Sequence, residues 1–169
     1  IVYTNTFGAN AHKLMRTGYT PEDIVKTAVR IAKIAAKPYD GLAALDIGPI
    51  GELLEPMGSL RFEEAYELFA QQIRAGAEAG ADLIAIETMT DLYEAKAALL
   101  AAKENCDLPV FVTMTFEQDG RTFTGCSVPA MALTLQGLGA DAIGINCSLG
   151  PKQIYSLART LVSWTTLPV

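Results

Sequence analysis

The chain has 169 residues, of which 50% are hydrophobic and 19% charged, and its formal net charge is −6. This composition excludes a disordered or low-complexity protein, and the lack of any run of about 20 apolar residues excludes a membrane-spanning helix. An acidic chain is poorly suited to the nucleic-acid backbone, so we expect no nucleic-acid partner. Three widely spaced cysteines, with no recognisable secretory signal, predict a cytoplasmic protein without disulfides.

Short apolar runs alternate with longer helical segments along the whole chain. The apolar runs predict strands at 1–5, 42–47, 83–86, 110–115 and 142–146, with a further strand beginning at Leu167. The segments between them predict helices at 10–37 (broken at Gly18), 59–79, 92–105, 129–138 and 151–164. A small hairpin is expected at 118–125. The chain therefore contains five strand–helix units and the start of a sixth.

Two of the predicted helices have a recognisable N-cap or hydrophobic periodicity. In the first, Thr20 is a plausible N-cap, Pro21 suits the first helical position and Asp23 complements the helix dipole. Helical spacing predicts that its buried face is formed by Ile24, Ala28, Ile31 and Ala35. The same spacing predicts a core stripe on the second helix, formed by Phe62, Tyr66, Phe69 and Ile73.

The predicted strands are apolar throughout rather than alternating, which is typical of parallel strands buried on both faces. Repeated β-α units allow an open doubly wound sheet or a (β/α)8 TIM barrel. We favour the barrel because no GxGxxG follows the first strand, and because polar residues recur where strands end, at the mouth of a barrel. These strand-end residues are Asn5, Asp46, Glu87, Thr113 and Asn146.

Four residues at this predicted mouth are candidates for chemistry, and each also has a structural explanation. Cys147 is placed for metal ligation or nucleophilic attack, or else is a small buried hydrophobe. Glu87 is placed to bind an ammonium group or act as a base, or else supports the next helix. Asp46 either belongs to the site or holds the following loop, and Asn5 either binds substrate or fixes backbone.

The other cysteines and the single histidine are weaker candidates. Cys106 lies at the entry end of a strand, where a barrel residue is usually structural. Cys126 lies on the mouth side, but no spacing links it to Cys147. His12 is expected to be a solvated helix residue. A zinc site made from these residues alone is weakly supported, because zinc needs three or four converging ligands.

Four motifs resemble the homocysteine-binding domain of the homocysteine S-methyltransferase family. They occur in that family's order and cover essentially the whole chain: TNTFGAN at 4–10, DIGPIGELLEP at 46–56, ETMTD at 87–91 and GINCSLGP at 144–151. The loop at 46–56 looks most like the cobalamin-dependent methionine synthase branch. The branches that use betaine or S-methylmethionine are less similar.

The resemblance implies a TIM barrel that transfers a methyl group to the zinc-bound thiolate of homocysteine, giving methionine. Zinc favours the thiolate, which is the nucleophile. Of the three cysteines that hold zinc in this family, Cys147 matches the first. Glu87 matches the carboxylate that holds the substrate amino group, and Asn5, Gly48 and Asn146 match other substrate-binding positions at the mouth. The implied donor is methylcobalamin, with methyltetrahydrofolate, on other modules; betaine and S-methylmethionine are alternatives.

The chain also departs from the family pattern. The family's adjacent Cys-Cys pair near the eighth strand and its opening strand are both missing. We therefore expect residues 1–169 to be a partial homocysteine-binding barrel domain, with strands two to six and the start of strand seven. Open strand edges would make the isolated chain prone to self-association, and we expect it to be inactive because one cysteine cannot hold zinc tightly.

Two other readings compete with the methyltransferase. A different barrel enzyme, of the aldolase or phosphate-binding type, is disfavoured because no predicted strand ends in lysine. A non-catalytic binding protein that kept the fold would show no zinc dependence even with the missing strands restored.

Overall fold

The computed structural model describes residues 1–169 and contains one parallel sheet of five strands. The strands are β1 (Val2–Tyr3), β2 (Ala43–Ile47), β3 (Leu83–Met89), β4 (Val110–Met114) and β5 (Ala142–Ile145). Each strand pairs with the next in sequence, so the spatial order is β1-β2-β3-β4-β5. A doubly wound sheet reverses its strand order at a switch point. The sequential order therefore excludes that alternative and is the order found in a barrel wall.

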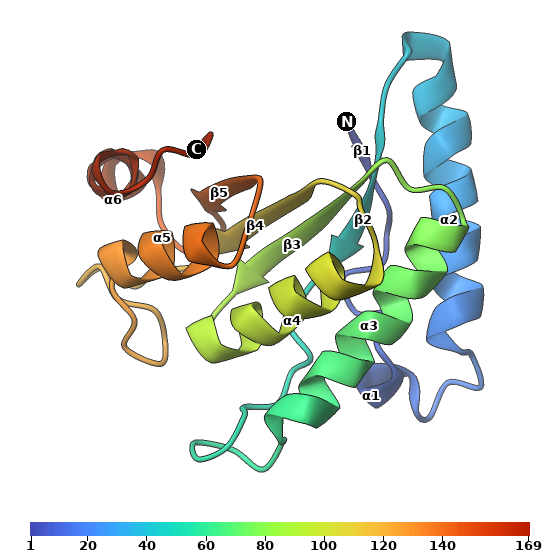
Figure 1. The fold of residues 1–169 in the computed structure, drawn as a ribbon, viewed down its shortest axis with the longest axis horizontal. Coiled ribbons are helices and arrows are strands. Elements are labelled where there is room, and N and C mark those ends of the chain that lie inside the picture. The colour runs from blue at the N-terminus through green and yellow to red at the C-terminus, as the bar shows by residue number, and fades with distance from the viewer.

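Helices connect the strands and pack against one another in chain order (Figure 1). They are α1 (Ala11–Leu14), α2 (Pro21–Ala36), α3 (Phe62–Glu78), α4 (Leu92–Asn105), α5 (Val128–Gly137) and α6 (Pro151–Trp164), with a short 3-10 helix, η1 (Lys37–Tyr39), after α2. None of these helices has the length and apolar character needed to cross a membrane. The arrangement is an α/β fold in which helices connect neighbouring parallel strands.

The two faces of the sheet differ because successive strand residues point to opposite sides. The large core includes Leu45, Ile84 and Val112, together with residues of the helices. A separate small cluster on the other face consists of Ala44, Leu83 and Ala85, with Phe111 packed against it. Continuing the alternation along β2 and β3, Asp46 and Glu87 lie on this second face, at the carboxyl ends of their strands.

Most predicted elements are confirmed, and the bounds of α4 and α6 agree to the residue. The predicted N-cap of α2 is also confirmed, because the Thr20 side chain accepts a hydrogen bond from the Asp23 backbone N–H. The start of α3 at Ser59 was wrong. Leu60 instead pairs with Leu54 in an isolated bridge, and the helix begins at Phe62 after the cap residue Arg61.

The predicted buried face of α2 was also wrong. The residues that α2 buries in its interior are Val25, Val29, Ala32 and Ala36, whereas Ile31 is 63% exposed. The helix has apolar residues on two adjacent stripes, and the positions of β2 and α3 decide which stripe is covered. On α3 the prediction holds for Phe69 and Ile73, which are fully buried, while Phe62 and Tyr66 are half-buried at the edge of the core.

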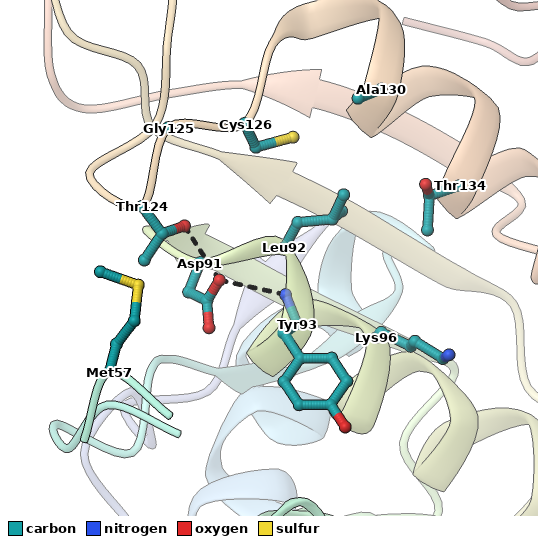
Figure 2. A pocket seen from close by; sticks show the side chains of 10 residues that line it. All are labelled: Met57, Asp91, Leu92, Tyr93, Lys96, Thr124, Gly125, Cys126, Ala130 and Thr134. Carbon is teal, nitrogen blue, oxygen red and sulfur yellow. Dashed lines mark hydrogen bonds between the residues drawn. The ribbon is translucent and has the colours of Figure 1, made fainter. Parts of the chain in front are cut away.

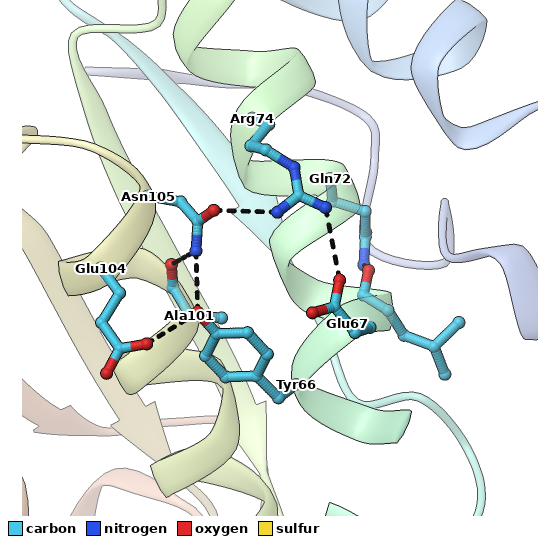
Figure 3. Close-up of polar contacts among 8 residues, drawn as sticks. Tyr66, Glu67, Gln72, Arg74, Ala101, Glu104 and Asn105 are labelled. Atoms are coloured by element: carbon cyan, nitrogen blue, oxygen red, sulfur yellow. Dashed lines mark hydrogen bonds and ion pairs between the residues drawn. The ribbon is translucent and has the colours of Figure 1, made fainter. Parts of the chain in front are cut away.

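A polar cluster ties α3 to α4 at the amino ends of the strands (Figure 3). The Tyr66 hydroxyl donates to Glu104 at 2.7 Å and accepts from Asn105 at 3.1 Å, and Arg74 donates to the Asn105 amide oxygen at 2.9 Å. These contacts lie at the outer rim of the helix layer, where they fix the two helices relative to each other without using buried charge.

The prediction of a further strand beginning at Leu167 was wrong, because no strand forms after α6. A single backbone hydrogen bond of 3.1 Å, from the Ile143 N–H to the Pro168 carbonyl oxygen, places this segment beside β5. The predicted hairpin at 118–125 is present only as a turn closed by an isolated antiparallel bridge between Arg121 and Ser127.

Candidate site at the carboxyl ends of the strands

An irregularity in β3 brings two consecutive side chains to the same place. The register between β3 and β4 shifts between Ile86 and Met89. Within the shift, Thr88 has a φ of 60°, in the left-handed region that a β-branched residue rarely adopts. A bulge of this kind re-aims side chains at the end of a strand. As a result, Glu87 and Thr88 both reach the same partner, Asn146.

Asn146 is the centre of a polar cluster that joins β3 to the end of β5. Its amide nitrogen donates to the Glu87 carboxylate at 3.1 Å, to the Thr88 hydroxyl at 2.8 Å and to the Cys147 sulfur at 3.4 Å. The Thr88 hydroxyl also lies 3.4 Å from Glu87 and 3.7 Å from the Cys147 sulfur. The cluster therefore joins a carboxylate to an exposed thiol through two neutral groups.

Cys147 is held at this position by an unusual backbone. Its φ is 68°, so it, like Thr88, is in the left-handed region. Strained residues of this kind are found where the surrounding structure over-determines them, often at functional sites. Here the Ser148 hydroxyl helps to hold the turn, because it accepts from the Phe116 backbone N–H at 3.0 Å and donates to the carbonyl of the same residue at 2.6 Å.

Asp46 lies next to Glu87 on the same face of the sheet and is only 6% exposed. Burial, followed by the charge of Glu87 and a hydrogen bond with it, raises the pKa of Asp46 to about 7. The pKa of Tyr3 is also raised, by burial and then by Glu87 and Asp46. The Asp46 backbone is fixed separately, because its N–H donates to Thr4 and its carbonyl oxygen accepts from Thr6.

Two of the predicted substrate residues lie outside this hydrogen-bonded cluster. Asn5 follows β1 and is exposed, and its side chain makes no hydrogen bond within the chain. Gly48 follows β2, where a Cβ would lie 2.5 Å from ring carbons of Phe7. The structure thus provides a packing reason for Gly48. A role for either residue in substrate binding stays a prediction.

The loop after β2 is held by hydrogen bonds with two side chains from other parts of the chain. The Lys13 ammonium donates to the Pro49 carbonyl oxygen at 2.7 Å, and the Ile50 N–H donates to the Glu94 carboxylate at 2.7 Å. Burial raises the pKa of Glu94 to about 7, although the bond from Ile50 acts in the opposite direction. His12, expected to be solvated, lies 3.3 Å from Glu52 in the same region.

A separate pocket lies between the amino ends of α4 and α5, outside the Asn146 cluster (Figure 2). Its volume is about 480 Å³, and Cys126 and Asp91 line it. Asp91 caps α4 and accepts from the Thr124 hydroxyl at 2.9 Å, which ties the 117–127 loop to that helix. Burial raises the pKa of the half-buried Cys126 thiol. Cys106 lies at the end of α4, where it donates to the Ala102 carbonyl oxygen, in keeping with a structural role.

No group of three or more histidine, cysteine or acidic side chains able to hold a metal converges in residues 1–169. A zinc site needs three or four such ligands. At the mouth, Cys147 is the one soft ligand, and Cys126 and His12 belong to other parts of the structure. Residues 1–169 therefore provide one ligand of a zinc site and not the three or four that a complete site needs.

The sequence had indicated Glu87, Asn146 and Cys147, and the structure brings these three together. Thr88 was missed as a site residue, since nothing in the local sequence signals a bulge or a left-handed threonine. The sequence alone does not decide between a site role and a loop-holding role for Asp46, because its proximity to Glu87 depends on the pairing of β2 with β3.

Comparison with known proteins shows what this chain is similar to. The family described as "Homocysteine S-methyltransferase" matches residues 1–169. Methionine synthase of Mycobacterium leprae is 30% identical over 183 aligned positions, and that of Mycobacterium tuberculosis is 29% identical over 182. Each alignment covers 99–100% of this chain and 15% of the relative, so the chain spans about 15% of the length of these curated relatives.

Among solved structures, the metallated form of the homocysteine methyltransferase MmuM from Escherichia coli superposes with a TM-score of 0.87. The sequences are 20% identical, and the match covers 98% of this chain and 64% of that one. A putative phosphonomutase from Burkholderia cenocepacia gives a TM-score of 0.54 at 20% identity, over 94% of this chain and 65% of that one. At such identities the similarity establishes the fold.

Proposed function

Because the chain belongs to the homocysteine S-methyltransferase family, we propose that its strand-end cluster binds homocysteine for methyl transfer to the substrate sulfur, giving methionine. The carrying observation is the chain of contacts from Glu87 through Asn146 to Cys147. It provides a carboxylate for the substrate's ammonium group and a thiol for a metal at opposite ends of one cluster.

In this proposal each residue has a limited task. Glu87 binds the ammonium group of homocysteine. Asn146 and Thr88 donate hydrogen bonds toward the Cys147 sulfur and so orient it as one ligand of zinc. When bound, zinc lowers the pKa of a thiol so that the nucleophilic thiolate forms at neutral pH. The remaining zinc ligands must come from outside residues 1–169, and Asn5 and Gly48 complete the substrate side.

Residues 1–169 are proposed to form part of a (β/α)8 barrel domain, covering strands two to six. Two features support this. The sheet has open edges at β1 and β5, which a closed barrel would pair (Figure 1). The matched E. coli enzyme is only 64% covered by this chain. We expect the isolated chain to lack activity and to self-associate through its open edges.

The similarity to methionine synthases supports methylcobalamin as the methyl donor, regenerated with methyltetrahydrofolate on other modules. Betaine or S-methylmethionine is the alternative donor. Assays with each donor in turn distinguish these cases, since only one should sustain methionine formation. The proposed setting is cytoplasmic.

The test is a zinc analysis of the 169-residue chain and of a version extended at both ends by the sequence that flanks it in its gene. We expect about one zinc per extended chain, none in the short chain, and loss of zinc in the extended Cys147→Ala variant. Cys106→Ala is the matched control and should keep its zinc. An extended protein without zinc would refute the methyltransferase mechanism and favour a non-catalytic barrel; zinc in the short chain would implicate Cys126 or His12.

A further inference from the structure

The bulge in β3 faces a polar residue of β4 to which the proposed function gives no task. The pairing of β3 with β4 is regular up to Ile86 and resumes at Met89. Between these points, Glu87 and Thr88 stand opposite one residue, Thr113. Two residues against one is the pattern of a β-bulge. In a regular strand successive side chains point to opposite faces, so Glu87 and Thr88 would not both reach the same partner.

A side-chain hydrogen bond from β4 supports this bulge. The Thr88 backbone N–H donates to Thr113 Oγ1 at 3.3 Å. The φ of Thr88 is 60°, a conformation that a β-branched residue keeps only where the surrounding structure imposes it. The Thr113 hydroxyl therefore holds the backbone of the strained residue from the neighbouring strand.

Thr113 also lies between the two sides of the Asn146 cluster. It pairs with Gly144 of β5, and a Cβ at Gly144 would lie 3.2 Å from the Thr113 methyl carbon, so both residues face the same side of the sheet. The Asn146 amide reaches from the end of β5 past β4 to Glu87 and Thr88. The residue of β4 at the point where these contacts cross the sheet is Thr113.

We propose that Thr113 is a positioning residue for substrate binding, whose hydroxyl holds the β3 bulge so that Glu87 and Thr88 meet at Asn146. This inference rests on the proposed function, in which Glu87 binds the ammonium group of homocysteine, and it deepens that function. Thr113 acts through the β3 backbone rather than through contact with the substrate.

The competing explanation is that Thr113 only packs as a β-branched strand residue against Gly144. Two substitutions separate the hydroxyl from the packing. Thr113→Val keeps the branched shape and removes the hydroxyl, so the Thr88 N–H loses this acceptor. Thr113→Ser keeps the hydroxyl and removes the methyl group that faces Gly144.

The test measures homocysteine affinity by titration calorimetry in the zinc-loaded protein extended at both ends. An unpaired N–H penalises the bulged state, and the apparent Kd rises as the population of the binding-competent state falls. Thr113→Val should therefore weaken homocysteine binding about tenfold or more at unchanged zinc content, whereas Thr113→Ser should stay within about threefold of wild type.

Thr122→Val is the matched control. The Thr122 hydroxyl also accepts a backbone N–H, from Cys126 at 3.0 Å, but it belongs to the 117–127 loop and not to the Asn146 cluster. This variant loses the same kind of hydrogen bond and should leave homocysteine affinity unchanged. Thermal unfolding by circular dichroism checks that each variant is folded.

The outcomes separate the inference from the proposed function. If Thr113→Val binds homocysteine as tightly as wild type, or if Thr113→Ser is weakened as much as Thr113→Val, the positioning role is refuted and the methyltransferase proposal stands. If wild-type protein with zinc does not bind homocysteine, the proposed function fails and the inference falls with it. Amide hydrogen exchange at Thr88 is a readout that needs no ligand: exchange should be faster in Thr113→Val only, and equal protection in wild type and this variant would overturn the inference.

Discussion

Asp82 allows a quantitative test of how successive β-α units are joined. It stands directly before β3, and its carboxylate accepts from the Ala43 N–H of β2 and from the Lys33 ammonium of α2, both at 2.7 Å. Its own N–H donates to the Ala43 carbonyl oxygen at 2.9 Å. One residue thus satisfies both backbone groups at the start of the neighbouring strand and pairs with the preceding helix.

The expected cost of Asp82→Ala follows from these contacts. It leaves the N–H of the fully buried Ala43 unpaired, which costs about 1–3 kcal/mol. It also removes the ion pair with the partly exposed Lys33, which contributes about 0–1 kcal/mol. Together these contributions give about 1–4 kcal/mol, which at about 2–4 °C per kcal/mol for a chain of this size should lower Tm by about 2–16 °C. Asp82→Asn keeps an acceptor and should cost about 1 kcal/mol, with Lys33→Met costing no more.

The pH dependence has a definite sign. The Ala43 N–H and then Lys33 lower the pKa of Asp82 below its ordinary value of 3.8. A carboxyl group with a depressed pKa stabilises the fold above its unfolded pKa, and this stability is lost as the pH falls through the folded pKa. The gap between wild type and Asp82→Asn should therefore be constant from pH 5 to pH 7 and close below about pH 4.

Calorimetric melting of the three variants at several pH values provides the measurement. The reasoning is refuted if Asp82→Ala melts within about 1 °C of wild type, or if Lys33→Met is as damaging as Asp82→Ala. The second result would place the stabilisation in the ion pair rather than in the backbone hydrogen bond.

Three further predictions concern other packing and charge features. Asp141 stands directly before β5 and accepts a hydrogen bond from the Val110 N–H of β4 at 2.8 Å, as Asp82 does from Ala43. Asp141→Ala should therefore lower the free energy of unfolding in urea by a similar amount, about 1–3 kcal/mol. Gly76→Ala places a Cβ 2.5 Å from a Leu45 methyl and should destabilise by about 0–2 kcal/mol after the helix-propensity gain, whereas Gly137→Ala, with open space, should be neutral or stabilising. Burial raises the pKa of Glu94 to about 7, so the contribution of Glu94 to the free energy of unfolding is full below its ordinary pKa of 4.5 and is lost as the pH rises through 7. The stability of Glu94→Gln relative to wild type should therefore increase by about 2–3 kcal/mol between pH 5 and pH 8. Identical dependence of stability on pH in the two proteins would contradict this.

The sequence was sufficient to predict the end of a helix where the residues that define that end lie within the same short segment. The bounds of α4 were predicted to the residue, and Asp91 caps it through its own side chain. Thr20 caps α2 in the same way. Capping residues, turn residues and hydrophobic periodicity act over a few neighbouring residues, so they can be recognised in the sequence alone. The strand-end positions of Glu87 and Asn146 were likewise visible as polar residues closing apolar runs.

The sequence by itself determined the repeated β-α units, the parallel character of the strands and the end of the sheet where polar residues collect. Only the tertiary structure decided the sequential strand order, the buried stripe of α2 and the bulge that brings Glu87 and Thr88 to Asn146. It also placed Asp46 beside Glu87 with an unpaired oxygen. These features depend on contacts between segments about 40 to 60 residues apart in the sequence. The energies of such contacts cannot be predicted from the residues of one short segment.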